Sequence, residues 1–333
     1  MNSDALSQLE DRISADLARV EARLNDCVHG SRNLVDELTS HLSKAGGKRM
    51  RPMLALLCAQ LGEPDEPANE RVIKAATAVE LTHLATLYHD DVMDSAPQRR
   101  GVPAAQHQWG NNRAILAGDI LFARASKLVA DLGARTIGYH AQTFERLCQG
   151  QLNETFGPEE DDDPIEFYIR VLADKTGSLI NAAGIFGAWH SGVSDEWADA
   201  VAEYGERIGI AFQLADDVID LTSGEEVSGK TPGTDLLEGV STLPVLLLEQ
   251  RHAAGTLDGV GADVLGLLER DLSDPAVLAD VVDRLGAHDV IDETREYAQR
   301  WVDQAIEAIA LLPDSVAKDA LIEFAHFTVH RMH

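Results

Sequence analysis

The sequence contains few basic residues. Its 333 residues include 28 lysines and arginines against 56 aspartates and glutamates, which gives a formal net charge of -28. Such an acidic chain repels nucleic acid and anionic membrane surfaces, so we expect neither as an electrostatic partner. An anionic substrate would therefore require bound metal cations or a local group of basic side chains.

Cysteine and long apolar runs are also scarce. Cys27, Cys58 and Cys148 lie far apart and form no CxxC pair, which indicates reduced thiols and a cytoplasmic protein. The apolar runs fall short of the ~18 residues that span a bilayer. The charged amphipathic segment 1–30 lacks the basic start and apolar core of a signal peptide. We therefore expect no transmembrane segment.

Strand-like alternation of apolar and polar residues is absent, whereas helical periodicity is common. Residues 71–89 and 114–133 carry apolar side chains at helical spacing. Glycine- and proline-containing breakers such as AGGKRMRP and SAPQRRGVP separate the helical stretches. No linker rich in proline, glycine or serine divides the chain. We expect an all-α protein whose single domain covers residues 1–333 as a helical bundle and begins with a helix over 1–30.

Two acidic pentads of the form DDxxD each end an apolar helical stretch, in YHDDVMDSA at 88–96 and LADDVIDLT at 214–222. A helix turns ~100° per residue, so Asp90 and Asp94 share one face, and Asp216 and Asp220 do the same. The C-terminal end of a helix disfavours negative charge. Acidic clusters are more often solvated faces, but two copies in this position favour pairs of carboxylates that hold Mg²⁺.

Basic residues follow glycines or the pentads at several places. These residues are Lys48 and Arg51 in GGKRMRP, Arg99 and Arg100 after the first pentad, Lys175 in DKTGSLINAAG, and Lys230 in SGKTPGTD. Mg²⁺ and basic side chains together suit a diphosphate. No phosphate loop of the GxxxxGK[ST] type is present, which argues against nucleotide chemistry.

In this order the motifs resemble those of the trans-isoprenyl diphosphate synthases, the polyprenyl synthetase family. The resemblance runs from residue 46 to 244 and includes ELTHLATLYHDDVMDSAPQRRG, WGNNRAILAGDILFARA and FQLADDVID. It implies the isoprenoid synthase type I fold, in which helices surround a large central cavity, and usually a homodimer. It also implies that isopentenyl diphosphate condenses with an allylic diphosphate, farnesyl or geranylgeranyl, with about three Mg²⁺ per active site bridging diphosphate and carboxylates.

The resemblance also assigns roles by position. Asp90, Asp94, Asp216 and Asp220 match the metal-binding aspartates, with Asp216 as the principal ligand of the second site. The isopentenyl diphosphate site corresponds to Lys48, Arg51, His83 and Arg100. The allylic site corresponds to Arg99, Lys175, Thr176, Gln213 and Lys230. Among these, Lys175 and Thr176 bring a backbone kink, and together with Gln213 they face the allylic carbocation that forms when the diphosphate leaves.

The resemblance also indicates product length. The growing chain is expected to run along the helix of the first pentad, where Ala85, Thr82 and Ala78 are small. Short-chain relatives often carry an aromatic residue at the position of Ala85. The small residues favour a product of about C30 to C50, such as the side chain of menaquinone, released through transient contact with a membrane. The alternative is a geranylgeranyl diphosphate synthase, because small residues also permit close helix packing and Phe122 could close the path.

Three other functions are less favoured. A class I terpene cyclase usually has an NSE-like second metal motif, whereas this chain repeats DDxxD. A non-catalytic partner subunit of the same fold typically lacks some of the aspartates or basic contacts, and every such position is filled here. A purely structural helical protein would leave both pentads and GGKRMRP without a purpose.

Overall fold

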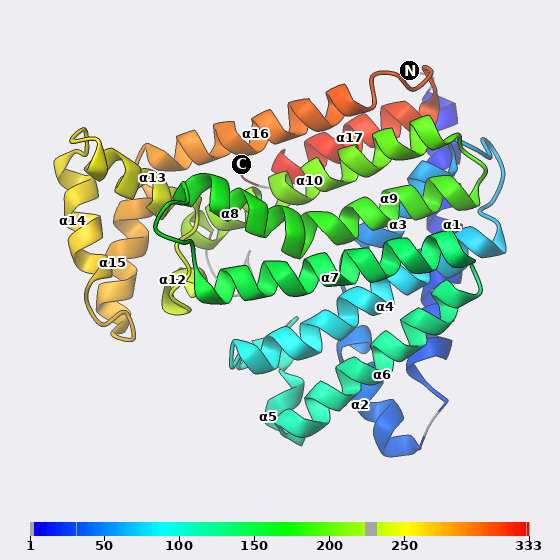
Figure 1. Cartoon of the computed structure of the whole chain (residues 1–333), viewed down its shortest axis with the longest axis horizontal. Coiled ribbons are helices and arrows are strands. Elements are labelled where there is room, and N and C mark those ends of the chain that lie inside the picture. Colours follow the sequence, from blue (N-terminus) through cyan, green and yellow to red (C-terminus); the bar gives the residue numbers. More distant parts are fainter. Residues whose placement is uncertain (1–2, 31, 224–231, 331, 333) are drawn as a thin grey trace. The chain divides into compact units, whose positions relative to one another are not determined.

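The computed structural model describes residues 3–30, 32–223, 232–330 and 332. It confirms the predicted all-helical fold (Figure 1). The contacts of the chain divide it into two compact units. Unit 1 contains residues 1–145, 179–205 and 308–323, and unit 2 contains residues 146–178, 206–307 and 324–333. The single domain over 1–333 remains a prediction.

The elements of unit 1 begin with the predicted N-terminal helix. They are α1 (Ser3–Val28), α2 (Asn33–Lys44), α3 (Met50–Ala59), α4 (Glu70–Met93), β1 (Gln98–Arg99), β2 (Val102–Pro103), α5 (Ala105–Trp109) and α6 (Asn111–Ala130). Among the described residues, five helices contribute to both units: α7 (Ala134–Phe156), α9 (Ser178–His190), α10 (Asp195–Thr222), α17 (Val316–His330) and, through Ala308 alone, α16 (Val290–Ala308).

The remaining elements lie in unit 2. They are α8 (Pro164–Leu172), the π-helix η1 (Ala173–Gly177), α12 (Thr234–Leu237), α13 (Leu243–Ala253), α14 (Gly259–Leu268) and α15 (Pro275–Gly286). Within the described ranges, no helix is both long and apolar enough to cross a membrane.

Helix α4 is the central element of unit 1. The side chain of Asn69 caps its start by accepting hydrogen bonds from the amides of Arg71 (2.9 Å) and Val72 (3.1 Å). The helix lies alongside α6 (Figure 1). Leu81 and Leu84 of α4 pack in one buried cluster with Leu121 of α6. This burial on several faces explains why α4 is apolar nearly all round.

A short β-hairpin follows α4, although the sequence showed no strand pattern. Gln98 pairs with Pro103, and Arg99 pairs with Val102. Arg100 and Gly101, which join the strands, have φ angles of 54° and 75°. Two consecutive positive φ angles are typical of a type I′ turn, whose twist matches that of paired strands. Each strand is two residues long, too short for alternation to be visible.

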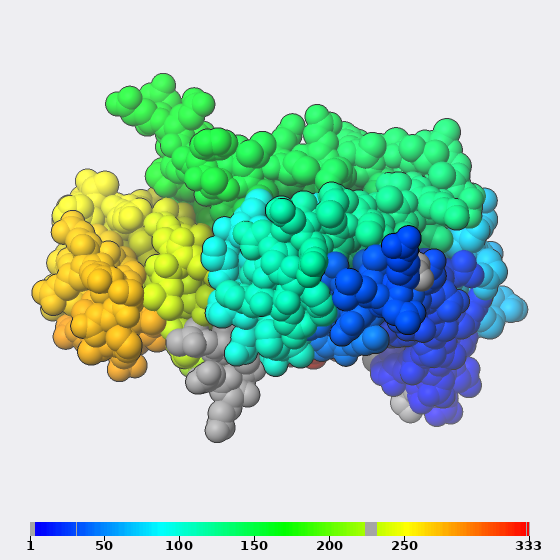
Figure 2. Space-filling model, turned by 90° about the horizontal axis from the view of Figure 1, so that it is seen from below, coloured from blue at the N-terminus to red at the C-terminus, as the bar shows by residue number. Residues whose placement is uncertain are grey.

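The acidic segment 157–163 joins α7 to α8 and projects from the surface, as the green protrusion in Figure 2. Asp163 caps α8, because its side chain accepts hydrogen bonds from the amides of Ile165 (3.0 Å) and Glu166 (2.9 Å). Asp162 accepts one from Arg170 at 2.6 Å. Two acidic residues of this segment, Asp162 and Asp163, therefore stabilise the start of α8.

Helices α3 and α9 approach each other closely at a glycine. A Cβ added to the buried Gly187 of α9 would fall inside contact distance of the carbonyl oxygen of Ala55 in α3. Gly138 of α7 is different, because it is exposed and nothing lies within 4 Å of its added Cβ. Only the first glycine is required by packing.

We predict opposite effects for the same substitution at these two glycines. Gly187→Ala should lower the free energy of unfolding by about 1–3 kcal/mol, because backbone atoms have to move. Gly138→Ala should raise it by about 0.5–1 kcal/mol, because alanine favours a helix interior. Urea unfolding followed by circular dichroism measures both. Equal effects of the two substitutions would contradict the close approach of α3 and α9.

A buried histidine makes the stability depend on pH. The His190 ring contacts Thr136 Oγ1 (Nε2, 3.1 Å) and Arg71 Nη2 (Nδ1, 3.4 Å). Burial, and then the charge of Arg71, lowers the pKa of His190 to about 4. Unfolded chains take up this proton near pH 6.5. As the pH falls from 6.5 to 4, protonation therefore increasingly favours the unfolded state.

We predict that His190→Gln weakens the loss of stability below pH 6.5. Between pH 7 and pH 4, the variant should lose about 3 kcal/mol less free energy of unfolding than the wild type. Urea titrations at a series of pH values measure this difference. His107→Gln, which changes an exposed imidazole, should follow the wild type. Parallel pH curves for the wild type and His190→Gln would refute the assignment.

Candidate active site

The first pentad ends α4. The helix closes at Met93, and the amide of Asp94 donates to the carbonyl of Asp90 at 2.8 Å. Asp90 is partly exposed and Asp94 is exposed, whereas Asp91 is completely buried. The two aspartates predicted to hold metal are thus the accessible ones, and the aspartate between them points into unit 1.

Asp91 fixes the hairpin to the end of α4. Its Oδ1 lies 2.6 Å from Nε of Arg99, and its carbonyl accepts a hydrogen bond from Nε2 of Gln106 at 2.7 Å. Burial raises the pKa of Asp91, although the adjacent Arg99 acts in the opposite direction. Arg99 was predicted to contact the allylic diphosphate, and in the structure its Nε is held by this carboxylate.

Arg100 is directed toward the glycine pair of GGKRMRP. Its Nη1 donates to the carbonyls of Leu42 (3.0 Å) and Gly46. An added Cβ at Gly47, whose φ is +152°, would lie 2.9 Å from Cζ of Arg100. The glycine therefore lets the guanidinium approach the backbone closely.

Arg51 and Arg100 form a basic cluster around His83. Burial is the main factor that lowers the pKa of Arg51 and Arg100, while Glu80 raises both. Burial, and then the positive charges of Arg51 and Arg100, hold the pKa of His83 well below 6.5. His83 is therefore neutral, so that it can take part in hydrogen bonds without adding charge. The structure brings together three of the four residues predicted for the isopentenyl site, and Lys48 is exposed on the adjoining loop.

The predicted chain-length residues are all buried. Ala78, Thr82 and Ala85 have 0% relative exposure. Thr82 Oγ1 lies 2.9 Å from Nε2 of His140 in α7, and Ala85 belongs to the cluster that packs against α6. One turn before Asp90, the partly exposed residues are Thr86 and Leu87, which helical spacing from Asp90 could have indicated.

In unit 2, the expected backbone kink at Lys175 and Thr176 is confirmed as the π-helix Ala173–Gly177. Lys175 forms an ion pair with Glu154 of α7. Thr176 Oγ1 lies 3.4 Å from Oε1 of Gln213. A Cβ on Gly150 would lie 2.7 Å from the amide nitrogen of Lys175, so this glycine allows α7 to lie against the π-helix. Gln213 therefore lies beside Thr176, the chain neighbour of Lys175, and the role of the three residues at the allylic substrate stays a prediction.

Arg146 ties the π-helix to its surroundings. Its Nε lies 2.7 Å from Oδ1 of Asp174, and its Nη1 lies 2.7 Å from Oε2 of Glu206 in α10. These two carboxylates outweigh burial and raise the pKa of Arg146. Two charge-assisted hydrogen bonds from one planar group hold the π-helix in a defined orientation.

The second pentad lies near the end of α10. Asp216 and Asp220 are partly exposed, and Asp217 is buried. Tyr168 Oη donates a hydrogen bond to Oδ2 of Asp217 at 2.7 Å. Burial is the main reason that the pKa of Asp217 is raised. Asp220 accepts hydrogen bonds from the amides of Thr234 (3.3 Å) and Asp235 (3.4 Å), which start α12. As in unit 1, the middle aspartate is structural and the outer two are accessible.

The donors of both pentads suit Mg²⁺, which prefers carboxylate oxygens and keeps several waters. In the part of the chain that the structure describes, no group of three or more acidic, histidine or cysteine side chains forms a metal site by itself. Each pentad would thus supply only part of a coordination shell, and diphosphate oxygens and water would complete it. Lys230 falls outside the described residues.

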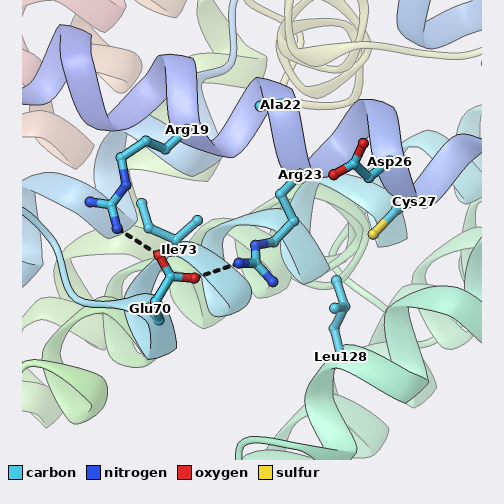
Figure 3. Close-up of a pocket in the computed structure, with 8 residues that line it drawn as sticks. All are labelled: Arg19, Ala22, Arg23, Asp26, Cys27, Glu70, Ile73 and Leu128. Carbon is cyan, nitrogen blue, oxygen red and sulfur yellow. Dashed lines mark hydrogen bonds and ion pairs between the residues drawn. The ribbon is translucent and has the colours of Figure 1, made fainter.

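A cavity of about 410 Å³ opens between α1, α4 and α6 (Figure 3). Glu70 lies at its edge and accepts hydrogen bonds from Arg19 and Arg23. Its lining consists of Arg19, Ala22, Arg23, Asp26, Cys27, Glu70, Ile73 and Leu128. None of the predicted site residues contributes to it, so the cavity is separate from the candidate active site.

Several residues that organise the site were missed from the sequence. Arg49 and Glu80 hold the basic loop, and Arg146 and Glu154 hold the π-helix. Each belongs to a common charged type and no spacing distinguishes it. Only the buried middle aspartates could have been inferred to need a partner, because they lie about 100° from the accessible face of the helix.

Comparison with known proteins identifies the family. Residues 32–259 match the Polyprenyl synthetase family. The chain is 42% identical over 320 residues to nonaprenyl diphosphate synthase of Mycobacterium tuberculosis, covering 96% of this chain and 93% of that relative. It is 35% identical to heptaprenyl diphosphate synthase component 2 of Geobacillus stearothermophilus, covering 94% of this chain and 95% of that relative.

A solved structure matches over the same extent. Geranylgeranyl pyrophosphate synthase of Corynebacterium glutamicum, complexed with calcium and isoprenyl diphosphate, has a TM-score of 0.84 and 43% identity, and the match covers 97% of both chains. Because these matches cover nearly the whole chain, they establish both the fold and the class of reaction. The chain belongs to the polyprenyl synthetase family and is a prenyltransferase with the isoprenoid synthase fold.

Proposed function

We propose that this prenyltransferase condenses isopentenyl diphosphate with an allylic diphosphate, farnesyl or geranylgeranyl, and repeats the reaction to form a long all-trans product. The observation that carries the proposal lies within unit 1. Accessible carboxylates of Asp90 and Asp94 end α4, and the hairpin attached there by Asp91 directs Arg100 to the loop before Arg51. Carboxylates that could bind metal therefore lie close to basic side chains that could bind a diphosphate. Such a basic group is unusual in a chain whose net charge is -28.

The family resemblance gives each group a role in the proposed reaction. Asp90, Asp94, Asp216 and Asp220 would hold about three Mg²⁺, which neutralise the leaving diphosphate when bound. Lys48, Arg51, His83 and Arg100 would bind isopentenyl diphosphate, and Arg99, Lys175 and Lys230 would contact the allylic diphosphate. Thr176 and Gln213 would direct oxygen dipoles at the allylic cation, where positive charge develops.

We propose a product of about C30 to C50 that serves as a menaquinone side chain, made by a cytoplasmic homodimer with transient membrane contact at release. The nonaprenyl and heptaprenyl relatives support a long product. The adjacent exposed apolar side chains of Ile115 and Leu116, near the start of α6, are compatible with self-association. The second candidate is a geranylgeranyl diphosphate synthase, favoured by the 43% identical Corynebacterium enzyme and by the packing of Ala85 against α6.

We predict that the purified chain with Mg²⁺ incorporates isopentenyl diphosphate into a farnesyl or geranylgeranyl primer. Asp90→Ala should reduce turnover by at least about a hundredfold, because a ligand that stabilises leaving-group charge is lost. Radiolabel incorporation measures the rate, and circular dichroism checks the fold. Asp131→Ala is the matched control, since Asp131 is an exposed aspartate of unit 1 that pairs with Lys74.

Three outcomes would overturn this proposal. Wild-type turnover in Asp90→Ala would remove the metal role. Hydrocarbon formed from the allylic diphosphate alone would indicate a terpene cyclase. An absence of product with every primer would indicate a non-catalytic subunit or a structural protein.

We predict that Ala85→Phe shortens the product. The larger ring would narrow the path beside α4 while leaving Asp90 and the basic cluster in place. The substitution should also lower the free energy of unfolding by about 1–3 kcal/mol, since Ala85 is completely buried. Chromatography of dephosphorylated products measures their length, compared at equal isopentenyl diphosphate incorporation. A C20 product from the wild type would select the second candidate, and an unchanged length in the variant would remove Ala85 from the path.

A further inference from the structure

Arg49 is held more completely than its neighbours in GGKRMRP. Its Nε and Nη2 bind the two carboxylate oxygens of Glu21 in α1, with an Nη2–Oε2 distance of 3.3 Å. Its Nη1 lies 3.0 Å from Oε1 of Glu80 in α4. Nη2 also donates to the carbonyl of Ser43 at 3.3 Å. One guanidinium therefore connects α1, the end of α2 and α4.

Glu80 is a buried acid in the middle of α4. Its side chain is 2% exposed and that of Arg49 is 10% exposed. It lies ten residues before Asp90 and three residues before His83. A buried carboxylate is costly unless it is paired and hydrogen-bonded, so the position of Glu80 requires a partner such as Arg49. In return, Arg49 is fixed relative to the helix that ends in the first pentad.

The neighbouring arginines are less fully neutralised. Arg51 Nε is buried and has no hydrogen-bond partner among the described residues. Arg100 Nη1 donates to two backbone carbonyls, which carry no net charge. The charge of Arg49 is balanced by Glu21 and Glu80, whereas Arg51 and Arg100 retain positive charge for an anion. In this cluster, therefore, Arg49 is paired with carboxylates, whereas Arg51 and Arg100 keep a positive charge that suits an anion.

The backbone conformation at Arg49 links this residue to the positions of Lys48, Arg51 and Arg100. Arg49 has φ +50°, a left-handed conformation that a non-glycine residue keeps only when its surroundings hold it. It lies directly between Lys48 and Met50 and immediately precedes α3, which carries Arg51. An added Cβ at Gly47 would lie 2.8 Å from Arg49 Nη1 and 2.9 Å from Arg100 Cζ, so the two guanidinium groups flank this glycine.

We propose that Arg49, held by Glu80 and Glu21, is the positioning residue of the isopentenyl diphosphate site. It acts through the loop 46–49, which it locks so that Lys48, Arg51 and Arg100 converge on one diphosphate. This inference rests on the proposed condensation activity and deepens it. Arg49 itself does not touch the substrate, because both sides of its guanidinium are engaged by carboxylates.

The test is the effect of Glu80→Gln on the two substrates separately. The substitution keeps the shape of the side chain and removes the charge that holds Arg49. The KM for isopentenyl diphosphate should rise by about tenfold to a hundredfold, since a displacement of about 1 Å has effects of this size. The KM for the allylic diphosphate should stay within about twofold. Glu80→Asp, which keeps the charge, should recover part of the loss.

Two further variants keep the test decisive. Glu70→Gln makes the same change at the start of α4, in the pair with Arg19 and Arg23, and should leave both KM values unchanged. Arg49→Lys keeps a charge but loses the planar fork. If Glu80→Gln does not fold, Arg49→Lys should show the same selective rise in the KM for isopentenyl diphosphate.

The outcomes separate this inference from the proposed function. An unchanged KM for isopentenyl diphosphate in both Glu80→Gln and Arg49→Lys overturns the positioning role. An equal rise in both KM values, or a lower kcat at unchanged KM, also overturns it, because either indicates a general structural effect. A wild-type chain that condenses no allylic diphosphate would instead overturn the proposed function.

Discussion

The candidate site depends on how arginines are paired with carboxylates in this acidic chain. Some arginines form ion pairs with buried acids, whereas others keep their positive charge. Two buried acids of α4 achieve this separation. Glu80 engages Arg49, and Asp91 engages Arg99 at 2.6 Å. The charges of Arg51 and Arg100 remain available for an anion, and Asp90 and Asp94 remain accessible for cations. Buried pairs contribute little net stability, so their value here is in orientation.

Unit 2 also combines a buried, paired aspartate with accessible aspartates on either side of it. Asp217 is buried against Tyr168, whereas Asp216 and Asp220 are accessible. Arg146 binds Asp174 and Glu206 and so fixes the π-helix that carries Lys175 and Thr176. In both units, therefore, the aspartate that follows the first residue of the pentad is buried and held by a side-chain contact. Such supporting contacts commonly determine how well a metal or diphosphate site is formed.

Much of this arrangement could be predicted from the sequence, because it follows from local periodicity. The helix over 71–89 and the accessible faces of both pentads depend on neighbours within a few residues, whereas the irregular backbone at Lys175 was expected only from the resemblance to the family. The hairpin at Arg100 could not be predicted, since its strands are two residues long. The Arg49–Glu80 pair joins residues 31 positions apart, and a single sequence gives no signal for a contact at that separation.

Product length shows the same limit. Ala78, Thr82 and Ala85 were identified by spacing from Asp90, but spacing could not show the hydrogen bond between Thr82 and His140 or the packing of Ala85 against α6. These contacts involve α6 and α7, whose positions are set by tertiary packing. These contacts place Thr82 against α7 and Ala85 against α6, and the path of the product beside α4 remains a proposal.

The proposed reaction requires metal on the pentads for the allylic diphosphate and the cluster of Arg51 and Arg100 for isopentenyl diphosphate. The most direct measurement is a crystal structure with Mn²⁺ and non-reactive analogues of both substrates, in which anomalous scattering locates the metal. We expect metal peaks bonded to Asp90, Asp94 and Asp216 and to the allylic diphosphate, with the isopentenyl diphosphate on Lys48, Arg51 and Arg100. Metal bound to only one pentad, or an isopentenyl diphosphate away from the arginine cluster, would contradict it.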